Sequence, residues 1–163
     1  MKAEAQKGQL PIDAPERRRL PLLLRRAWYG LNQAFRRRIA HLEITPDQFT
    51  VMRTLLENEG LRQRELSEIM TSDPNTVASL LERMEKAGLI HREEHRRDRR
   101  AHQLTLLPLG RRKYEEARKI AIALQAEVLS ALPESSRESF LEQLAQVADA
   151  CKDSADNAPK KAS

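Results

Sequence analysis

Arginine is concentrated in two stretches of this chain, and both have the composition of a phosphate-binding surface. Residues 17–42 hold eight arginines and no Asp or Glu, and residues 92–100 hold five arginines. The whole chain has 29 Lys and Arg against 24 Asp and Glu, a formal net charge of +5, so the basic excess is local. Clustered arginine is the electrostatic footprint of a nucleic-acid contact. The alternative, a solvated charged face, usually interleaves acids, which the first stretch lacks and the second partly has.

Polar residues suited to reading base edges precede the second arginine stretch. The spacing i, i+3, i+4, i+7 predicts a helix whose buried apolar stripe consists of Val77, Leu80, Leu81 and Met84. The opposite face then presents Asn75, Thr76 and Ser79, near the helix start that recognition helices turn to the major groove. We assign Ser72 and Arg83 to the phosphate backbone. Solvation is the alternative for each residue, and for Asn75 local hydrogen bonding at the helix start is a second one.

Capping signals predict where the helices begin and end. Residues 45–48 read Thr-Pro-Asp-Gln, a capping box with proline at the first helical position. Asp73 and Pro74 can cap and open the helix with the apolar stripe, and Gly88 can end it. Residues 61–70 predict the first helix of a helix-turn-helix pair. Its inward-facing residues would be Leu66, Ile69 and Met70.

The remaining elements complete a winged helix. Apolar flanks at 89–90 and 103–107 predict the two strands of a hairpin, the wing, with its tip at 96–100. Long helices are expected over 17–42 and from Pro108 onward, and a final helix closes the chain. We therefore predict a mostly α (α+β winged helix) fold of about six helices with a two- to three-stranded β-wing.

The first and last helices have apolar seams that the winged helix does not cover. The seam of the first helix is Leu24, Trp28, Leu31, Phe35 and Leu42. The simplest partner for such seams is a second copy of the chain, so we expect a homodimer formed by the N- and C-terminal helices. The predicted division is a flexible N-terminal arm, 1–16; a helical dimerisation region, 17–45 and 108–151; a winged helix-turn-helix DNA-binding domain, 46–107; and a disordered tail, 152–163.

Composition excludes several other classes of protein. Cys151 is the single cysteine, so neither an intramolecular disulfide nor a Cys-rich metal knuckle can form. No segment has the apolar core of a signal peptide or the ~18 apolar residues of a spanning helix, so we expect a cytoplasmic protein without a membrane partner. No nucleophile, base and orienting group cluster together, and no glycine loop cradles phosphate, so we expect neither an enzyme nor a cofactor.

Residues 91–95 match the H-x-x-E-H string of inverted zinc peptidases. That string requires a helix to bring both histidines to one metal, whereas here it follows a helix stop and enters a hairpin. On a strand, His91, Glu93 and His95 would share one face. Two interpretations therefore remain: we expect these to be solvated wing residues, and the alternative is a weak metal site.

The order of elements and two motifs resemble the MarR family of bacterial transcriptional regulators. The motifs are Leu-Leu-Glu-Arg-Met-Glu-Lys-Ala-Gly-Leu-Ile at 80–90 and Asp-Arg-Arg at 98–100, and the resemblance covers residues 20–150. It implies a homodimer on a palindromic operator in double-stranded DNA, usually a repressor, often released by a small ligand or by oxidation. The family usually has Leu-Thr before the helix that follows the wing. This chain has Leu-Leu-Pro at 106–108 and so lacks that hydroxyl cap.

The resemblance also implies roles for the wing residues. Asp98 would accept hydrogen bonds from Arg100 and hold its guanidinium extended into the minor groove, with Arg97 and Arg99 on neighbouring phosphates. The alternative is a solvated turn with a local Asp-Arg pair. Such a pair contributes little energy and does not explain five arginines in nine residues.

Arg38 interrupts the apolar seam of the first helix, and two interpretations stay open. In one, Ile39 takes the inward position while Arg38 reaches solvent or an acid. In the other, Arg38 lies with Trp28, Asn32 and Phe49 in a pocket, where members of the resembled family tend to bind aromatic acids. A guanidinium fork fits a carboxylate, so an aromatic acid or a related acyl thioester would be the small-molecule inducer.

Two alternatives to a ligand-released repressor remain. One is a winged-helix architectural or interaction module that binds DNA without a ligand. The other is a redox-responsive regulator acting through Cys151. That thiol could instead be buried or lie at an interface, because it continues the stripe of Leu144, Val147 and Ala148 on the last helix.

Overall fold

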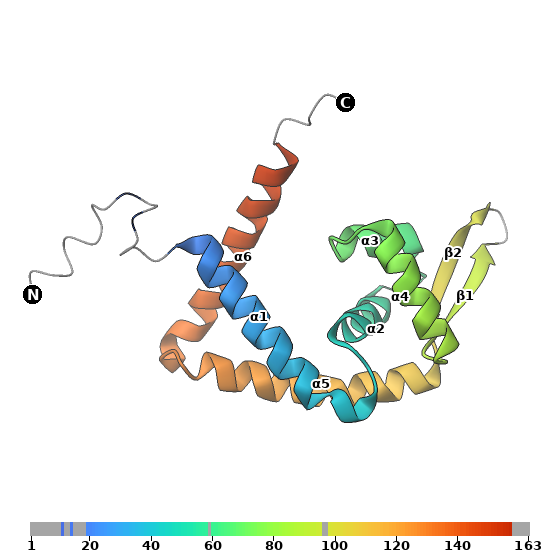
Figure 1. Cartoon of the computed structure of the whole chain (residues 1–163), viewed down its shortest axis with the longest axis horizontal. Helices are drawn as coiled ribbons and strands as arrows, with labels where there is room; N and C mark the ends of the chain where they lie inside the picture. Colours follow the sequence, from blue (N-terminus) through green and yellow to red (C-terminus); the bar gives the residue numbers. More distant parts are fainter. Residues whose placement is uncertain (1–10, 12–13, 15–18, 59, 96–97, 158–163) are drawn as a thin grey trace, which may run out of the picture. The chain divides into compact units, whose positions relative to one another are not determined.

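The computed structural model describes residues 11, 14, 19–58, 60–95 and 98–157, and for residues 94, 95 and 98–102 it describes the backbone alone. The elements in chain order are α1 (Leu20–Arg38), η1 (Ala40–Leu42, a 3₁₀ turn), α2 (Pro46–Glu57), α3 (Gln63–Ile69), α4 (Pro74–Lys86), β1 (Ile90–His95), β2 (Asp98–Leu106), α5 (Pro108–Leu129) and α6 (Glu134–Asp156) (Figure 1). The chain divides into two compact units, residues 1–121 and 122–163. The predicted mostly α winged helix is confirmed.

The capping signals act where the sequence predicted them. The Thr45 hydroxyl accepts from the Gln48 backbone N–H at 3.2 Å, and the Gln48 side chain accepts from the Thr45 N–H at 2.9 Å, which is the reciprocal capping box. Helix α4 ends in a Schellman motif, in which Gly88 has φ 69° and the Leu89 N–H bonds the Met84 carbonyl at 3.0 Å. The start of α2 and the end of α4 therefore follow from local sequence.

One apolar core joins α2, α3, α4 and the hairpin. Its fully buried side chains are Ile39, Val51, Met52, Leu66, Val77, Leu81, Met84, Leu89 and Ile90. At its margin Phe49 packs edge-on against Phe35, with ring centroids 5.0 Å apart, and stacks on Tyr114 at 5.3 Å. These three rings tie α1, α2 and the first half of α5 together, and aromatic pairs of this geometry add ~0.5–1.5 kcal/mol beyond burial.

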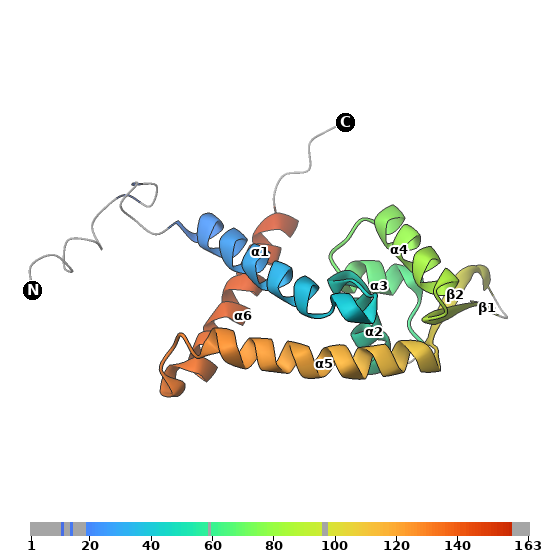
Figure 2. The same ribbon diagram turned by 60° about the horizontal axis from the view of Figure 1, so that its bottom comes forward.

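The wing is a two-stranded antiparallel sheet with a third contribution from the start of the module. In its register Ile90 pairs with Leu106 and Arg92 with Leu104. The segment before α3 adds one bridge, Arg62 to Gln103, beside a bond from the Leu104 N–H to the Leu61 carbonyl at 3.1 Å. Helix α4 leads straight into this hairpin, as both views show (Figures 1 and 2).

Several predicted boundaries were wrong. The first helix ends at Arg38 instead of continuing to residue 42, because the chain turns through η1 and Glu43 takes a left-handed φ of 54°. The strands extend further toward the tip than 89–90 and 103–107, since backbone pairing continues past the apolar residues. Ile69 is 53% exposed instead of inward-facing, because the seven-residue α3 buries only one apolar side chain, Leu66.

The prediction of a disordered C-terminal tail over 152–163 was wrong for the first residues of that range. Helix α6 runs through Asp156, so the backbone is helical well past residue 152, whereas residues 158–163 lie outside the described part. Cys151 is exposed within the chain, so it is not buried in the core of a protomer. Most of the predicted N-terminal arm, 1–16, also lies outside the described residues. Among the described helices, none has the length and apolarity of a membrane span.

Candidate nucleic-acid interface

Asp73 holds the first turn of α4. Its Oδ2 accepts from the backbone N–H groups of Asn75 and Thr76, each at 3.0 Å, and Pro74 occupies the first helical position. A helix start leaves several N–H groups without intrahelical partners; the carboxylate satisfies two of them and proline lacks one. The turn is therefore fixed, and the side chains leaving it have defined directions.

The side chains predicted to read bases lie exposed on that turn and the next. Asn75, Thr76 and Ser79 are all exposed. Among the described residues the Asn75 side-chain amide has no hydrogen-bond partner, so the local bonding considered as its alternative does not occur there. The Thr76 hydroxyl lies 3.4 Å from Asp73 Oδ2 and is shared with the cap. Asn75 and Ser79 are thus the freer donors and acceptors of the three.

The buried stripe fixes which face of α4 points outward. Val77, Leu81 and Met84 are at most 1% exposed, and Leu80 is 6% exposed. Full burial stabilises each such side chain by ~1.5–3 kcal/mol, so rotating α4 about its axis would cost several kcal/mol. The opposite face carries Arg83, which is exposed toward the end of the helix. The predicted buried face of α4 is confirmed.

The turn between α3 and α4 is strained at one residue. Thr71 is β-branched and has φ 50°, a left-handed conformation that costs ~1–3 kcal/mol. The next residue, Ser72, is half-buried, and its N–H bonds the Ser67 carbonyl at 3.1 Å. This places Ser72 immediately before the capped start of α4, where its predicted backbone contact stays a prediction.

The structure describes the wing only in part. Asp98, Arg99 and Arg100 belong to β2, but their side chains lie outside the described part, and Arg97 lies wholly outside it. The strand register shifts between Glu94 and His95. The roles predicted for the tip residues therefore remain predictions.

Arg92 was grouped with the phosphate-binding arginines, and the structure gives it a different partner. Its Nε and Nη2 lie 2.8 Å and 2.7 Å from Glu85 Oε2, and its backbone N–H donates to Glu85 Oε1 at 3.2 Å. The hydrogen bond from the guanidinium lowers the pKa of Glu85 below its ordinary value. Sequence reasoning missed this pair. The available signal was an acid in the last turn of a helix, where the helix dipole disfavours it.

The four predicted pocket residues lie in different environments. Phe49 is buried between Phe35 and Tyr114, Asn32 is half-buried, and Trp28 is 65% exposed. Arg38 is exposed, whereas Ile39 is fully buried. The interpretation in which Ile39 takes the inward position therefore describes the fold of the protomer.

The histidines at the base of the wing do not form a metal site with their described neighbours. His91 Nε2 lies 3.9 Å from Glu93 Oε1, whereas the side chain of His95 is outside the described part. Among the described residues no group of three metal-ligating side chains gathers.

A contact that the sequence did not predict anchors the start of α5. Lys113 Nζ donates to the Leu42 carbonyl at 2.8 Å. This bond fixes the first turns of α5 against the segment before α2.

Comparison with known proteins places this geometry among transcriptional regulators. A profile of the MarR family matches residues 44–102. The transcriptional regulator HosA of Escherichia coli is 30% identical over 125 residues, covering 74% of this chain and 93% of HosA. The chain belongs to the MarR family. This confirms the resemblance seen in the sequence, and with it a DNA-binding transcriptional regulator instead of an enzyme.

Two other relatives extend the comparison. The MarR-family chain is 34% identical over 91 residues to the transcriptional repressor MdtR of Bacillus subtilis, which covers 56% of this chain and 59% of MdtR. It matches the structure of the transcriptional repressor CouR bound to a 23-mer DNA duplex with a TM-score of 0.74 and 29% identity, covering 79% of this chain and 92% of CouR.

Proposed function

We propose that this MarR-family regulator is a homodimeric repressor that inserts one α4 from each protomer into the major groove of a palindromic operator. The observation that carries the proposal is the capped start of α4, which exposes Asn75 and Ser79 on a helix whose opposite face is buried. Recognition helices of helix-turn-helix proteins contact bases with such N-terminal residues. The repressors CouR and MdtR among its relatives support the sign of regulation.

The arginines around α4 would supply the sequence-independent part of binding. Arg83 is exposed on the outer face of α4, and β2 carries Arg99 and Arg100. We propose that Arg83, Arg97, Arg99 and Ser72 contact phosphates, while Asp98 orients Arg100 toward the minor groove. Each lost phosphate contact lowers the slope of binding against salt by about one unit, whereas a lost base contact does not.

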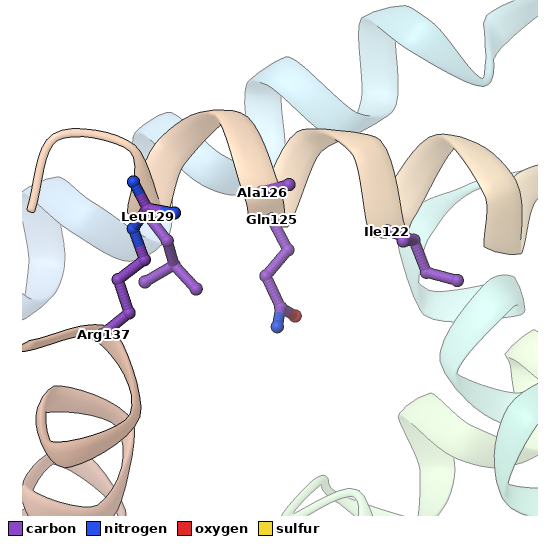
Figure 3. A pocket seen from close by; sticks show the side chains of 5 residues that line it. All are labelled: Ile122, Gln125, Ala126, Leu129 and Arg137. Atoms are coloured by element: carbon purple, nitrogen blue, oxygen red, sulfur yellow. The ribbon is translucent and has the colours of Figure 1, made fainter. Parts of the chain in front are cut away.

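The exposed apolar surface of the second unit supports a homodimer. In α6 none of the residues is buried, and Phe140 and Leu144 are 42% and 37% exposed. A hollow of about 320 Å³ beside it is lined by Ile122, Gln125, Ala126 and Leu129 of α5 and by Arg137 of α6 (Figure 3). Exposed apolar side chains beside a hollow are typical of an interface, and a second copy presents the same surface to cover them.

Release by a small ligand is part of the proposal. An aromatic acid would place its carboxylate on Arg38, and Trp28 and Asn32 lie earlier on the same helix. Phe49 would contribute only if its stacking partners shifted, because it is buried between two rings. Such a ligand separates the dimer from DNA only through its differential affinity for the two states, typically about 1–3 kcal/mol.

Selection of bound duplexes from random-sequence DNA tests the central proposal. A palindrome with half-sites about one helical turn apart is expected, followed by footprinting that shows protection of both half-sites. An architectural module would instead yield no preferred motif and an even footprint. Sedimentation at micromolar concentration separately tests the dimer, and a stable monomer would contradict it.

Redox control is a second candidate, favoured by the exposure of Cys151 on α6. Peroxide would then weaken operator binding by the parent protein but not by Cys151→Ser. Equal sensitivity of the two proteins, or none, would remove this candidate.

A further inference from the structure

A half-buried ion pair links the recognition helix to the wing. Glu85 lies in the last turn of α4 and Arg92 lies on β1, and their side chains are 32% and 25% exposed. Three contacts of 2.7–3.2 Å join them, two from the guanidinium and one from the Arg92 backbone N–H. Both carboxylate oxygens are engaged, so the pair fixes an orientation as well as a distance.

Local helix energetics do not explain the acid at this position. A carboxylate in the last turn faces the negative end of the helix dipole and is disfavoured there. The neighbouring acid Glu82 instead forms an exposed pair with Lys86 at 2.8 Å, one turn along the same helix. Glu85 is therefore compensated by the wing, across the Gly88 turn, and not by its own helix.

The pair lies between the buried base of the hairpin and the point where the strand register shifts. Ile90 is buried at the base of β1, and Arg92 follows on the same face, opposite the buried Leu104. The regular register breaks two residues later, between Glu94 and His95. Among the described side chains, Arg92 is thus the outermost one of β1 that is tied to α4.

We propose that Glu85 and Arg92 are positioning residues for DNA binding, which hold the wing at the orientation where its tip and α4 engage one duplex together. Neither residue touches DNA in this role. The proposal rests on the proposed wing contact by Arg100, and it adds that this contact has its full effect only while the pair is intact.

A double-mutant cycle on the full-length protein tests the coupling. The probe is the duplex obtained by the selection described above, and the measured quantity is its Kd. Glu85→Gln should raise the Kd about tenfold, within the range measured for coupled neighbours. Arg100→Ala should also raise it, and the double variant should be little weaker than Arg100→Ala alone. With Asn75→Ala in place of Arg100→Ala, the two losses should instead add.

Glu82→Gln is the matched control. It removes the same negative charge from the same helix, and charge alone would strengthen DNA binding in both glutamine variants. The proposal expects weaker binding only for Glu85→Gln, with a thermal unfolding midpoint that shows the variant folded at the assay temperature. Glu85→Gln should also give a shorter footprint, in which protection is lost at the flanks and kept over the centres of the half-sites.

The possible outcomes distinguish failure of the positioning role from failure of the wing contact by Arg100. If Arg100→Ala leaves the Kd unchanged, the wing contact itself fails. If Arg100→Ala weakens binding but Glu85→Gln does not, or if their losses add, the wing contact stands and the positioning role is overturned. If Glu85→Gln is unfolded, Arg92→Gln replaces it, because it removes the guanidinium but keeps the backbone N–H that donates to Glu85: a short footprint supports the role, and a folded variant with the parent footprint overturns it.

Discussion

Replacing Gly110 by alanine should destabilise the protein, because α5 begins in direct contact with the corner between α4 and the wing. A Cβ at this position would overlap the Leu89 carbonyl oxygen and lie 2.7 Å from Leu106 Cδ1. The Leu89 carbonyl cannot easily move away, since it accepts the Leu107 N–H at 2.9 Å. Either this bond or the approach of α5 must give way.

The magnitude follows from two opposing terms. A methyl group forced into a well-packed site typically costs ~1–3 kcal/mol, and alanine in a helix recovers ~0.5–1 kcal/mol relative to glycine. The overlap here involves backbone, which moves less readily than a flexible side chain, so the first term should lie at the upper end of its range. We expect a net loss of about 2 kcal/mol, and weaker DNA binding because the wing base shifts.

Gly30→Ala is the matched control for this prediction. Gly30 lies inside α1, and the Cβ that alanine adds there would have no neighbour within 4 Å, so alanine should stabilise the helix by ~0.5–1 kcal/mol. Urea unfolding of both variants and the parent, at one protomer concentration, measures the two free energies. A Gly110→Ala variant as stable as the parent would refute the close approach of α5 to Leu89.

The remaining predictions concern readout, assembly, release and pH. Asn75→Ala should relax the selected motif at one position and cost ~1–3 kcal/mol there, and an unchanged motif would remove its base contact. Leu141→Glu with Leu144→Glu should abolish dimerisation and specific DNA binding together, as sedimentation and titration would show. Arg38→Ala should keep operator affinity but lose the response to an inducer found by screening aromatic acids. Because the pair with the wing lowers the folded-state pKa of Glu85, its stabilisation is fully present above the unfolded pKa and is lost as the pH falls through the folded value. The stability gap between parent and Glu85→Gln should therefore be constant at neutral pH, begin to narrow near the unfolded carboxyl pKa of about 4.3, and close once the pH falls below the folded pKa, as urea titrations would show.

Local chemistry made the helix boundaries of the DNA-binding module predictable. The Thr45 capping box, the Asp73 cap and the Gly88 stop each depend on residues within five positions of one another. Such bonds form wherever the local sequence allows them, with little help from the rest of the chain. The buried stripe of α4 was predictable for a similar reason, because helical periodicity alone brings those side chains to one face.

The sequence did not predict which of two neighbouring residues on a helix becomes buried where another element packs against it. Arg38 and Ile39 both fit the first helix, and packing against the core selected Ile39. Ile69 matched the apolar pattern of α3, yet the short helix leaves it exposed. In each case the outcome depends on the volume available next to the residue, which residues distant in the chain define.

The winged helix-turn-helix, the helix that forms α4 and the family could be predicted from the sequence, because they depend on caps, periodicity and a short motif. The pairing of Arg92 with Glu85, and the start of α5 against the Leu89 carbonyl, became visible only in the folded chain. Charge and glycine content were visible in the sequence. The residues that these charges and glycines contact were not visible, because ion pairs and close approaches depend on how the chain turns back on itself. The free energy of that arrangement is shared among all the residues packed around it.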